Sequence, residues 1–264
     1  MPVALGDSRA RRIVRPVLRP LVGRVQRWRA RNLTDRERWE RALPGEERFW
    51  RRVLESTALR ERWNPMRPDY AWGERDMYAR VAERLPLGRV KVLDVGAGPI
   101  SAVPKVHPGR TFDVTAIDPL AALFDGLLRE YGIEPWVRTI PGTGEALLEL
   151  VEPCTFDVAH ASNSVDHTHD PALVIRNMLL AVKPGGLVLL RHTRNEAVNE
   201  HYRALHQWNF DLVDGDFVLW RPGVRRNLSR ELADLGSGDP YLHERWIIWV
   251  LERRPPAPGT PPSS

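Results

Sequence analysis

The 264-residue chain contains a single cysteine, Cys154, so it can form neither an internal disulfide nor a cysteine-based zinc site. It also lacks a long apolar run, because the longest, Trp246 to Leu251, is far shorter than the ~20 residues of a transmembrane helix. We find no secretory signal, since arginines interrupt every apolar stretch near the N-terminus. These absences argue against a disulfide-stapled secreted protein and a membrane-spanning protein, and they favour a cytoplasmic location.

The composition is that of a globular protein, with 42% hydrophobic and 28% charged residues. The net charge of +5 is unevenly distributed, because residues 1–31 hold nine arginines and one acid, whereas the remainder holds 30 basic and 33 acidic residues. Three interpretations of this basic arm stay open: a loosely ordered extension, a segment that contacts a partner or the inner membrane face, and a nucleic-acid-binding arm.

The region between the arm and the main domain is predicted to be helical. Thr34 and Glu37 have the spacing of a capping box at a helix start, and Glu46 begins a second helical stretch. A break at 64–68 precedes another helix over 74–85. At the other end, residues 255–264 contain five prolines and are expected to be disordered.

Short apolar segments alternate with helical ones through the rest of the chain. The expected strands cover 90–95, 112–117, 136–140, 156–161 and 187–192, and the expected helices cover 101–106, 120–131, 145–151 and 171–182. This alternation predicts an α/β fold with a parallel sheet covered on both faces. Ligands of such sheets bind at the carboxyl ends of the strands.

The first of these strands ends in Asp94-Val95-Gly96-Ala97-Gly98, so two glycines lie at a strand-to-helix turn. Glycines there let the backbone bend sharply and approach a ligand closely. A dinucleotide-binding turn would need a third glycine at Ser101, and Asp94 would then lie beside the pyrophosphate. Asp118 ends the second strand, where a carboxylate can accept hydrogen bonds from both hydroxyls of a ribose. These motifs favour a ligand with a ribose and a cationic group rather than a pyrophosphate.

These residues resemble the cofactor-binding motifs of class I S-adenosylmethionine-dependent methyltransferases, and the resemblance covers residues 75–195. Three later segments match the family in order: 144–146 resembles its adenine-contacting turn, 156–160 its fourth strand, and 180–186 the turn into its fifth strand. The resemblance implies S-adenosylmethionine as cofactor. The residues that it assigns to cofactor binding are Asp94, Gly96, Ala97, Gly98, Asp118, Pro119, Gly144, Glu145, Ala146, Ser162 and Asn163.

The same resemblance implies a doubly wound, Rossmann-like sheet of seven mostly parallel strands with a helical N-terminal extension. Its last two strands, which are antiparallel, are expected at 217–220 and 246–251. We therefore divide the chain into a basic arm (1–31), a helical segment that covers the substrate site (32–85), the methyltransferase domain (86–254) and a proline-rich tail (255–264).

Titratable side chains follow the fourth strand, in the run Asp166-His167-Thr168-His169-Asp170. Methylation of a hydroxyl requires removal of its proton, and a histidine suits that task near neutral pH. The run resembles bacterial sugar and polysaccharide O-methyltransferases, including the mycobacterial methylmannose polysaccharide type, and this resemblance assigns the base to His167. His192 is the second candidate. Asp166 orients His167, binds substrate or caps a turn, and His167 itself could be a structural residue of that turn.

A second polar region follows the fifth strand and is expected to bind the acceptor. Its candidate residues are Asn195, Glu196, Tyr202, His206 and Trp208. The alternative is a short helix whose apolar face includes Tyr202 and Trp208. A metal is not expected, although Asp166, Glu196 and Asp170 could offer oxygens to Mg²⁺, and the histidines at 167 and 169 form an incomplete zinc pattern.

These observations together predict an enzyme that methylates a hydroxyl of a sugar or oligosaccharide. The alternatives are an O-methyltransferase of a non-sugar small molecule or natural product, a ribose or RNA methyltransferase recruited by the basic arm, and a cofactor-binding protein without catalysis. DNA is not an expected partner, because the chain lacks the Pro-Pro-aromatic motif of enzymes that methylate amino groups of bases.

Overall fold

The computed structural model describes residues 33–62 and 64–255. The predicted basic arm (1–31) and residues 256–264 of the predicted tail lie outside this range. Within the described chain, every helix falls short of the length and hydropathy that crossing a bilayer would require.

The main sheet runs in the order β10-β11-β5-β4-β1-β2-β3, with the short β9 paired to β11. The five strands from β3 to β5 are parallel, whereas β11 is antiparallel to β5, and β10 to β11. This order confirms the predicted doubly wound sheet. The strands are β1 (Gly88–Val95), β2 (Arg110–Asp118), β3 (Thr139–Pro141), β4 (Phe156–Ser162), β5 (Val182–Thr193), β9 (Gly236–Ser237), β10 (Tyr241–His243) and β11 (Trp246–Arg253).

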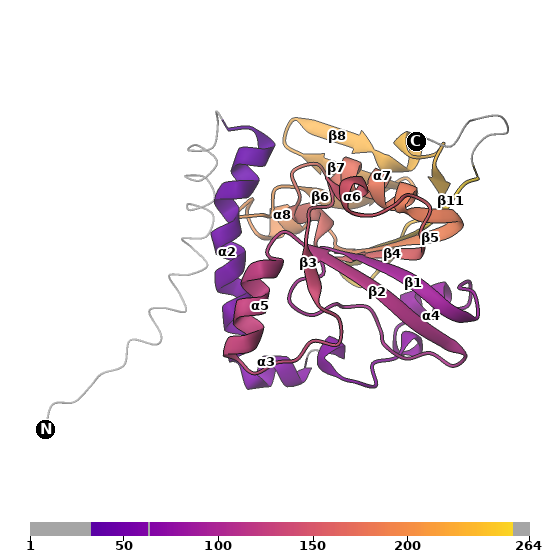
Figure 1. Cartoon of the computed structure of the whole chain (residues 1–264). Helices are drawn as coiled ribbons and strands as arrows, with labels where there is room; N and C mark the ends of the chain where they lie inside the picture. Colours follow the sequence, from indigo (N-terminus) through magenta and orange to yellow (C-terminus); the bar gives the residue numbers. More distant parts are fainter. Residues whose placement is uncertain (1–32, 63, 256–264) are drawn as a thin grey trace, which may run out of the picture.

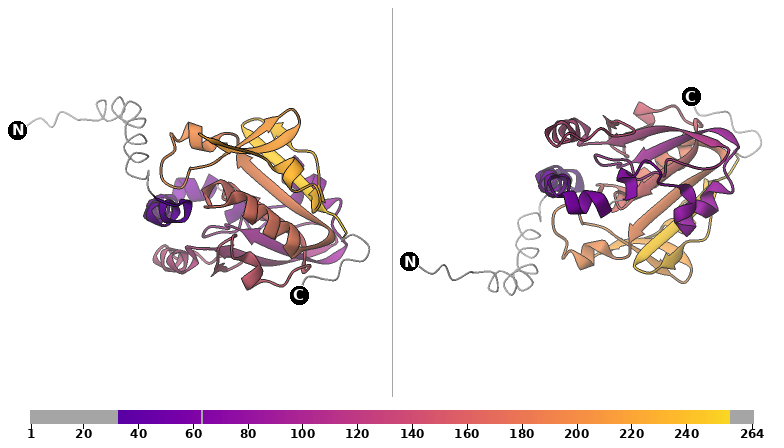
Figure 2. Two further views of the ribbon diagram at one scale, coloured as in Figure 1. Left: turned by 90° about the horizontal axis from the view of Figure 1, so that it is seen from above. Right: turned by 90° about the horizontal axis from the view of Figure 1, so that it is seen from below.

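Helices cover both faces of the sheet (Figures 1 and 2). Tyr78 and Val81 of α4 pack on one face, and Ile175 and Met178 of α7 pack on the other. The helices are α2 (Asp35–Glu55), α3 (Thr57–Arg62), α4 (Asp76–Ala82), α5 (Ala121–Glu130), α6 (Leu147–Leu150), α7 (Pro171–Ala181), α8 (Glu196–Asn199) and α9 (Leu228–Glu231), with 3₁₀ turns η1 (Asn64–Met66), η2 (Trp72–Glu74) and η3 (Val165–His167).

The helix expected at 101–106, directly after the glycine turn, is absent. Ser101 donates from Oγ to Asp94 Oδ2 (2.7 Å), and the same Oγ accepts the backbone N–H of Val103 (3.3 Å). Pro104 has no N–H to donate within a helix. The expectation was wrong because serine and proline together favour an irregular segment here.

The strand expected at 217–220 forms, but it does not join the main sheet. It belongs to a separate antiparallel sheet of β6 (Asn209–Val213), β7 (Asp216–Arg221) and β8 (Val224–Asn227). Asp214 and Gly215 both have positive φ, the conformation of a tight two-residue hairpin turn. Because this turn pairs β7 with β6, the outer place in the main sheet is taken by β10.

The N-terminal helix α2 stands beside one end of the sheet, next to α5 (Figures 1 and 2). Its predicted capping box is confirmed, because Thr34 Oγ1 accepts from the Glu37 N–H and Glu37 accepts from the Thr34 N–H. The helix is continuous through Pro44, so the separate stretch expected from Glu46 does not exist. Two ion pairs attach α2 to the main domain, Arg51 to Glu130 of α5 and Asp35 to Arg221 of β7.

Candidate active site

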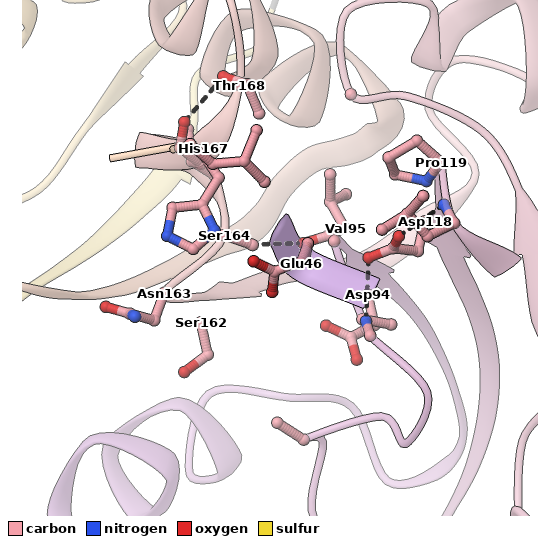
Figure 3. A pocket seen from close by; sticks show the side chains of 18 of the residues that line it. Glu46, Asp94, Val95, Asp118, Pro119, Ser162, Asn163, Ser164, His167 and Thr168 are labelled. Carbon is pink, nitrogen blue, oxygen red and sulfur yellow. Dashed lines mark hydrogen bonds between the residues drawn. The ribbon is translucent and has the colours of Figure 1, made fainter. Parts of the chain in front are cut away.

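A cavity of about 950 Å³ lies at the carboxyl ends of β1, β2 and β4. The glycine turn, the segment after β4, residues 196–206 and one side of α2 form its walls. Figure 3 shows Glu46 of α2 among side chains from the end of β2, such as Asp118, and from the segment after β4, such as Ser164 and His167. The cavity therefore lies where the α/β pattern predicted a ligand site.

The glycine turn approaches its neighbours too closely for any larger residue. Gly96 and Gly98 both have positive φ, at 69° and 66°. A Cβ on Gly96 would lie 2.5 Å from Cβ of Ser164, and a Cβ on Gly98 would lie 2.9 Å from the ring of Trp50. Gly96, Ala97 and Gly98 all line the cavity, as predicted for a turn that cradles a ligand.

Asp118, the predicted ribose ligand, is held in the cavity wall by two backbone hydrogen bonds. Its Oδ2 accepts from the Gly98 N–H (3.1 Å) and its Oδ1 from the Leu120 N–H (2.9 Å). Burial raises the pKa of Asp118 to about 6, although these two hydrogen bonds oppose the rise. Its neighbour Pro119 also lines the cavity. The carboxylate is thus fixed with lone pairs left for hydroxyl donors.

The predicted adenine turn is only partly in the cavity wall. Gly144 and Glu145 line the cavity, whereas Ala146 does not. Oε1 of Glu145 accepts the backbone N–H groups of His169 (2.9 Å) and Asp170 (3.2 Å). Glu145 therefore supports the start of α7, and its contact with adenine stays a prediction.

A buried chain of hydrogen bonds lies on the α4 side of the sheet. Nδ1 of His160 is 2.7 Å from Asp94 Oδ1, and its Nε2 is 2.9 Å from the Tyr78 hydroxyl. Because Ser101 Oγ donates a hydrogen bond to Asp94 Oδ2, both carboxylate oxygens of Asp94 have protein partners. Asp94 thus shapes the cavity through its neighbours. Ser162 and Asn163, also predicted for the cofactor, line the cavity nearby.

On the opposite side of the sheet, two histidines from distant segments meet over a buried carboxylate. Nε2 of His167 lies 3.0 Å from Nδ1 of His206, and both side chains line the cavity. Oδ2 of Asp166 lies 3.5 Å from the first nitrogen and 3.9 Å from the second. Asp166 is 1% exposed, and neither of its oxygens has a well-aligned hydrogen bond among the described residues.

Burial and charge act differently on these groups. Burial lowers the pKa of His167 to about 4. Burial also disfavours the charged form of His206, but Asp166, Glu196 and Glu200 outweigh it and raise the pKa of His206. For Asp166, burial is likewise outweighed, because the imidazoles of His167, His192 and His206 hold its pKa well below the usual range.

Several predicted acceptor and catalytic residues lie outside the cavity wall. His192 is completely buried, with Nδ1 3.3 Å from Asp166 Oδ1 and its ring against Phe210, so it cannot reach an acceptor as a base. Asn195 accepts from the indole N–H of Trp220, and the hydroxyl of Tyr202 accepts from Asn209. Trp208 is buried beneath the guanidinium of Arg221. Of the five predicted acceptor residues, only Glu196 and His206 line the cavity.

Residues that sequence reasoning missed complete the site. They are Glu46, Tyr70, Arg75, Tyr78, His160 and Arg191, and all of them line the cavity. Burial raises the pKa of Glu46, which lies on the same side of α2 as Leu43 and Trp50. That spacing, an acid among apolar residues at helical intervals, is the one signal that could have marked Glu46 beforehand.

The only metal-compatible group among the described residues consists of Asp166, His167 and His206, whose ligand atoms lie within 4.8 Å of one another. It differs from the Mg²⁺ and zinc sets considered from the sequence. Asp170 instead caps α7, where its side chain accepts from the Leu173 N–H.

Comparison with known proteins identifies the family. The model of the methyltransferase domain family matches residues 48–236, so the match includes part of α2 and strands β1 to β8. The ubiquinone biosynthesis O-methyltransferases of Pseudomonas putida and Stutzerimonas stutzeri are 37% and 31% identical over 176 residues. These alignments cover 65% of this chain and 66% of each relative.

A solved S-adenosylmethionine-dependent methyltransferase from Clostridium acetobutylicum covers 74% of this chain and 92% of its own, at 12% identity and a TM-score of 0.44. A likeness at that level carries no argument about function. The glycine cradle, the fixed Asp118 and the cavity volume nevertheless fit a nucleoside cofactor. The chain belongs to the S-adenosylmethionine-dependent methyltransferases of the methyltransferase domain family.

Proposed function

We propose that this protein is an O-methyltransferase in which His167 and His206 act together as the proton acceptor. The observation that carries the proposal is their hydrogen bond in the cavity wall, over the buried carboxylate of Asp166. S-adenosylmethionine supplies a methyl group on a sulfonium, and the acceptor oxygen must lose its proton as it takes that methyl group. The earlier assignment of His167 alone as the base is thereby extended to a pair.

Proton counting shows why the pair can act as one base. A neutral imidazole has one N–H and one lone pair, and the hydrogen bond between the rings uses one of each. The two nitrogens that remain therefore carry one N–H and one lone pair between them. That lone pair can accept a hydroxyl proton, and Asp166, Glu196 and Glu200 stabilise the cation that results.

We further propose that the acceptor is a phenolic hydroxyl on a largely apolar molecule. Trp39, Leu43 and Phe49 of α2 line the cavity together with Leu205. A phenol ionises near pH 10, far more readily than a sugar alcohol, so a neutral imidazole pair can accept its proton more easily. The relatives, named for ubiquinone biosynthesis, give no support to the sugar acceptor expected from the sequence.

The proposal is tested with methyl-labelled cofactor and three acceptor panels, one of catechols and hydroxylated quinols, one of mono- and oligosaccharides, and one of RNA. We expect methyl ethers of phenols, identified by mass spectrometry. Sugar ethers would overturn the acceptor, methylated RNA would support the alternative of a recruited RNA enzyme, and cofactor binding without any product would support a non-catalytic protein.

The proton acceptor is tested with His167→Ala and His206→Ala, each expected to lower kcat by about 10²- to 10⁴-fold. His243→Ala is the control, because His243 is exposed on β10. Wild-type kcat in both cavity variants, with normal cofactor binding, would refute the role of the pair.

A further inference from the structure

Arg191 places a guanidinium in the cavity without an acidic partner. It lies near the carboxyl end of β5, beside Ser162 of β4, and its Nη1 donates to Ser162 Oγ (3.2 Å). Its guanidinium carbon lies 3.3 Å from the centre of the Trp246 ring. Among the described residues, no carboxylate lies within ion-pair distance of Arg191. Burial lowers the pKa of Arg191 to about 10.

A second arginine increases the positive charge of this corner. Arg75 precedes α4, lines the same cavity, and lowers the pKa of Arg191 further by charge repulsion. It too makes no ion pair within the described part of the chain. Both side chains are partly buried in the cavity wall, where a charge without a counter-ion is unfavourable, so two unmatched guanidinium groups indicate a site for an anion.

The other corners of the cavity suit different parts of the ligands. Asp118, at the end of β2, repels anions and suits hydroxyl donors. The His167–His206 pair lies on the α7 side of the sheet, where the acceptor is proposed. Arg75 and Arg191 lie on the α4 side with Tyr78 and His160, beyond the glycine turn. The cofactor has one anionic group, the carboxylate of its methionine moiety.

We propose that Arg191, assisted by Arg75, binds the methionine carboxylate of S-adenosylmethionine and is thereby a positioning residue for the methyl donor. The sheet order β2-β1-β4-β5 puts Arg191 three strand spacings, about 14 Å, from Asp118. An extended methionine chain and an arginine side chain span that interval together. The proposal rests on the family's cofactor and not on the acceptor proposed above.

The test compares two ligands by isothermal titration calorimetry, without any acceptor. S-adenosylhomocysteine has the carboxylate, whereas methylthioadenosine keeps the nucleoside and lacks the amino-acid part. For Arg191→Gln we expect affinity for S-adenosylhomocysteine to fall about 10- to 100-fold, the size of a lost charge-assisted contact, while methylthioadenosine binds as before. Arg75→Gln is expected to show the same selectivity with a smaller loss, and Arg191→Lys a partial loss.

Arg245→Gln is the matched control, because Arg245 faces the same Trp246 ring (4.9 Å) from an exposed position outside the cavity wall. Circular dichroism and thermal unfolding show independently whether each variant is folded. If Arg191→Gln bound S-adenosylhomocysteine like the wild type, or lost both ligands equally while remaining folded, the assignment would be overturned. Failure of the proposed acceptor leaves this result unaffected, since no methyl transfer is measured.

Discussion

His167 and His206 are 39 residues apart in the chain, yet Nε2 of the first lies 3.0 Å from Nδ1 of the second, over the buried carboxylate of Asp166. The two rings meet edge to face, with centres 4.5 Å apart. His167 comes from the 3₁₀ turn after β4 and His206 from the loop after α8. This junction links the two polar regions that the sequence marked separately.

The pH dependence of catalysis should follow His206. Its pKa is raised because Asp166, Glu196 and Glu200 outweigh the effect of burial, and the pair is a base only when neutral. We expect kcat to rise with pH through an apparent pKa above the ordinary value of 6.5. Glu200→Gln removes a stabilising charge, so its profile should shift to lower pH. Glu231→Gln serves as the control, because Glu231 is exposed. A midpoint of the kcat profile that stays in place or moves to higher pH in Glu200→Gln would contradict the assignment to His206.

Metal removal distinguishes the base pair from the metal-compatible group made by the same three side chains. Because each imidazole is hydrogen-bonded to the other, we expect exhaustive chelation and dialysis to leave kcat unchanged. Activity is measured before and after addition of Zn²⁺, Mn²⁺ and Mg²⁺, with elemental analysis of the protein. Loss of activity that one ion restores at unit stoichiometry would show that the cluster is a metal site.

Cofactor affinity should depend on pH through Asp118. Burial raises the pKa of Asp118 to about 6, and hydroxyl donors from a ribose favour its ionised form. Affinity for S-adenosylhomocysteine is therefore expected to increase as pH rises through about 6. Asp118→Asn should bind more weakly and lose that dependence. Calorimetry between pH 5 and 8 measures both effects, and an identical pH dependence in the variant would exclude Asp118 as its source.

Gly98→Ala should weaken cofactor binding. Its positive φ costs an alanine roughly 1–2 kcal/mol, and the new methyl would lie 2.9 Å from Trp50 of α2. Gly126→Ala is the matched control, since Gly126 lies within α5 with free space around it and should gain up to about 1 kcal/mol of stability. Thermal unfolding with and without S-adenosylhomocysteine separates the two effects. Equal ligand-induced shifts in both variants would contradict the close approach.

The ion pair between Asp35 and Arg221 should hold the start of α2 against the main domain. Its two hydrogen bonds are 2.7 and 2.8 Å long, and both side chains are partly buried. Arg221→Gln should cost no more than about 1 kcal/mol of global stability but increase hydrogen exchange in α2. Arg36→Gln is the control, because its pair with Glu40 lies within α2 and is exposed. Unchanged exchange in Arg221→Gln would mean that packing alone holds the helix.

Much of the cofactor side of the site was predictable, because its signals are local. A strand that ends in Asp94-Val95-Gly96-Ala97-Gly98 and an acid that ends the next strand meet at one edge of a parallel sheet, whatever surrounds them. The errors arose where a short-range interaction competed with the expected element. Ser101 donates a hydrogen bond to Asp94, and the short helix expected after it does not form. The Asp214-Gly215 turn pairs β7 with β6, so β7 does not join the main sheet.

The sequence by itself determined the parallel sheet, the glycine turn and the family. Only the tertiary structure decided which polar side chains face the cavity. It buried His192 and Trp208, joined His167 to His206, and brought Arg75 and Arg191 together on the α4 side. The physical reason is that residue types and spacing specify strands and turns, whereas burial, pKa and unpaired charge depend on neighbours that lie far away in the chain.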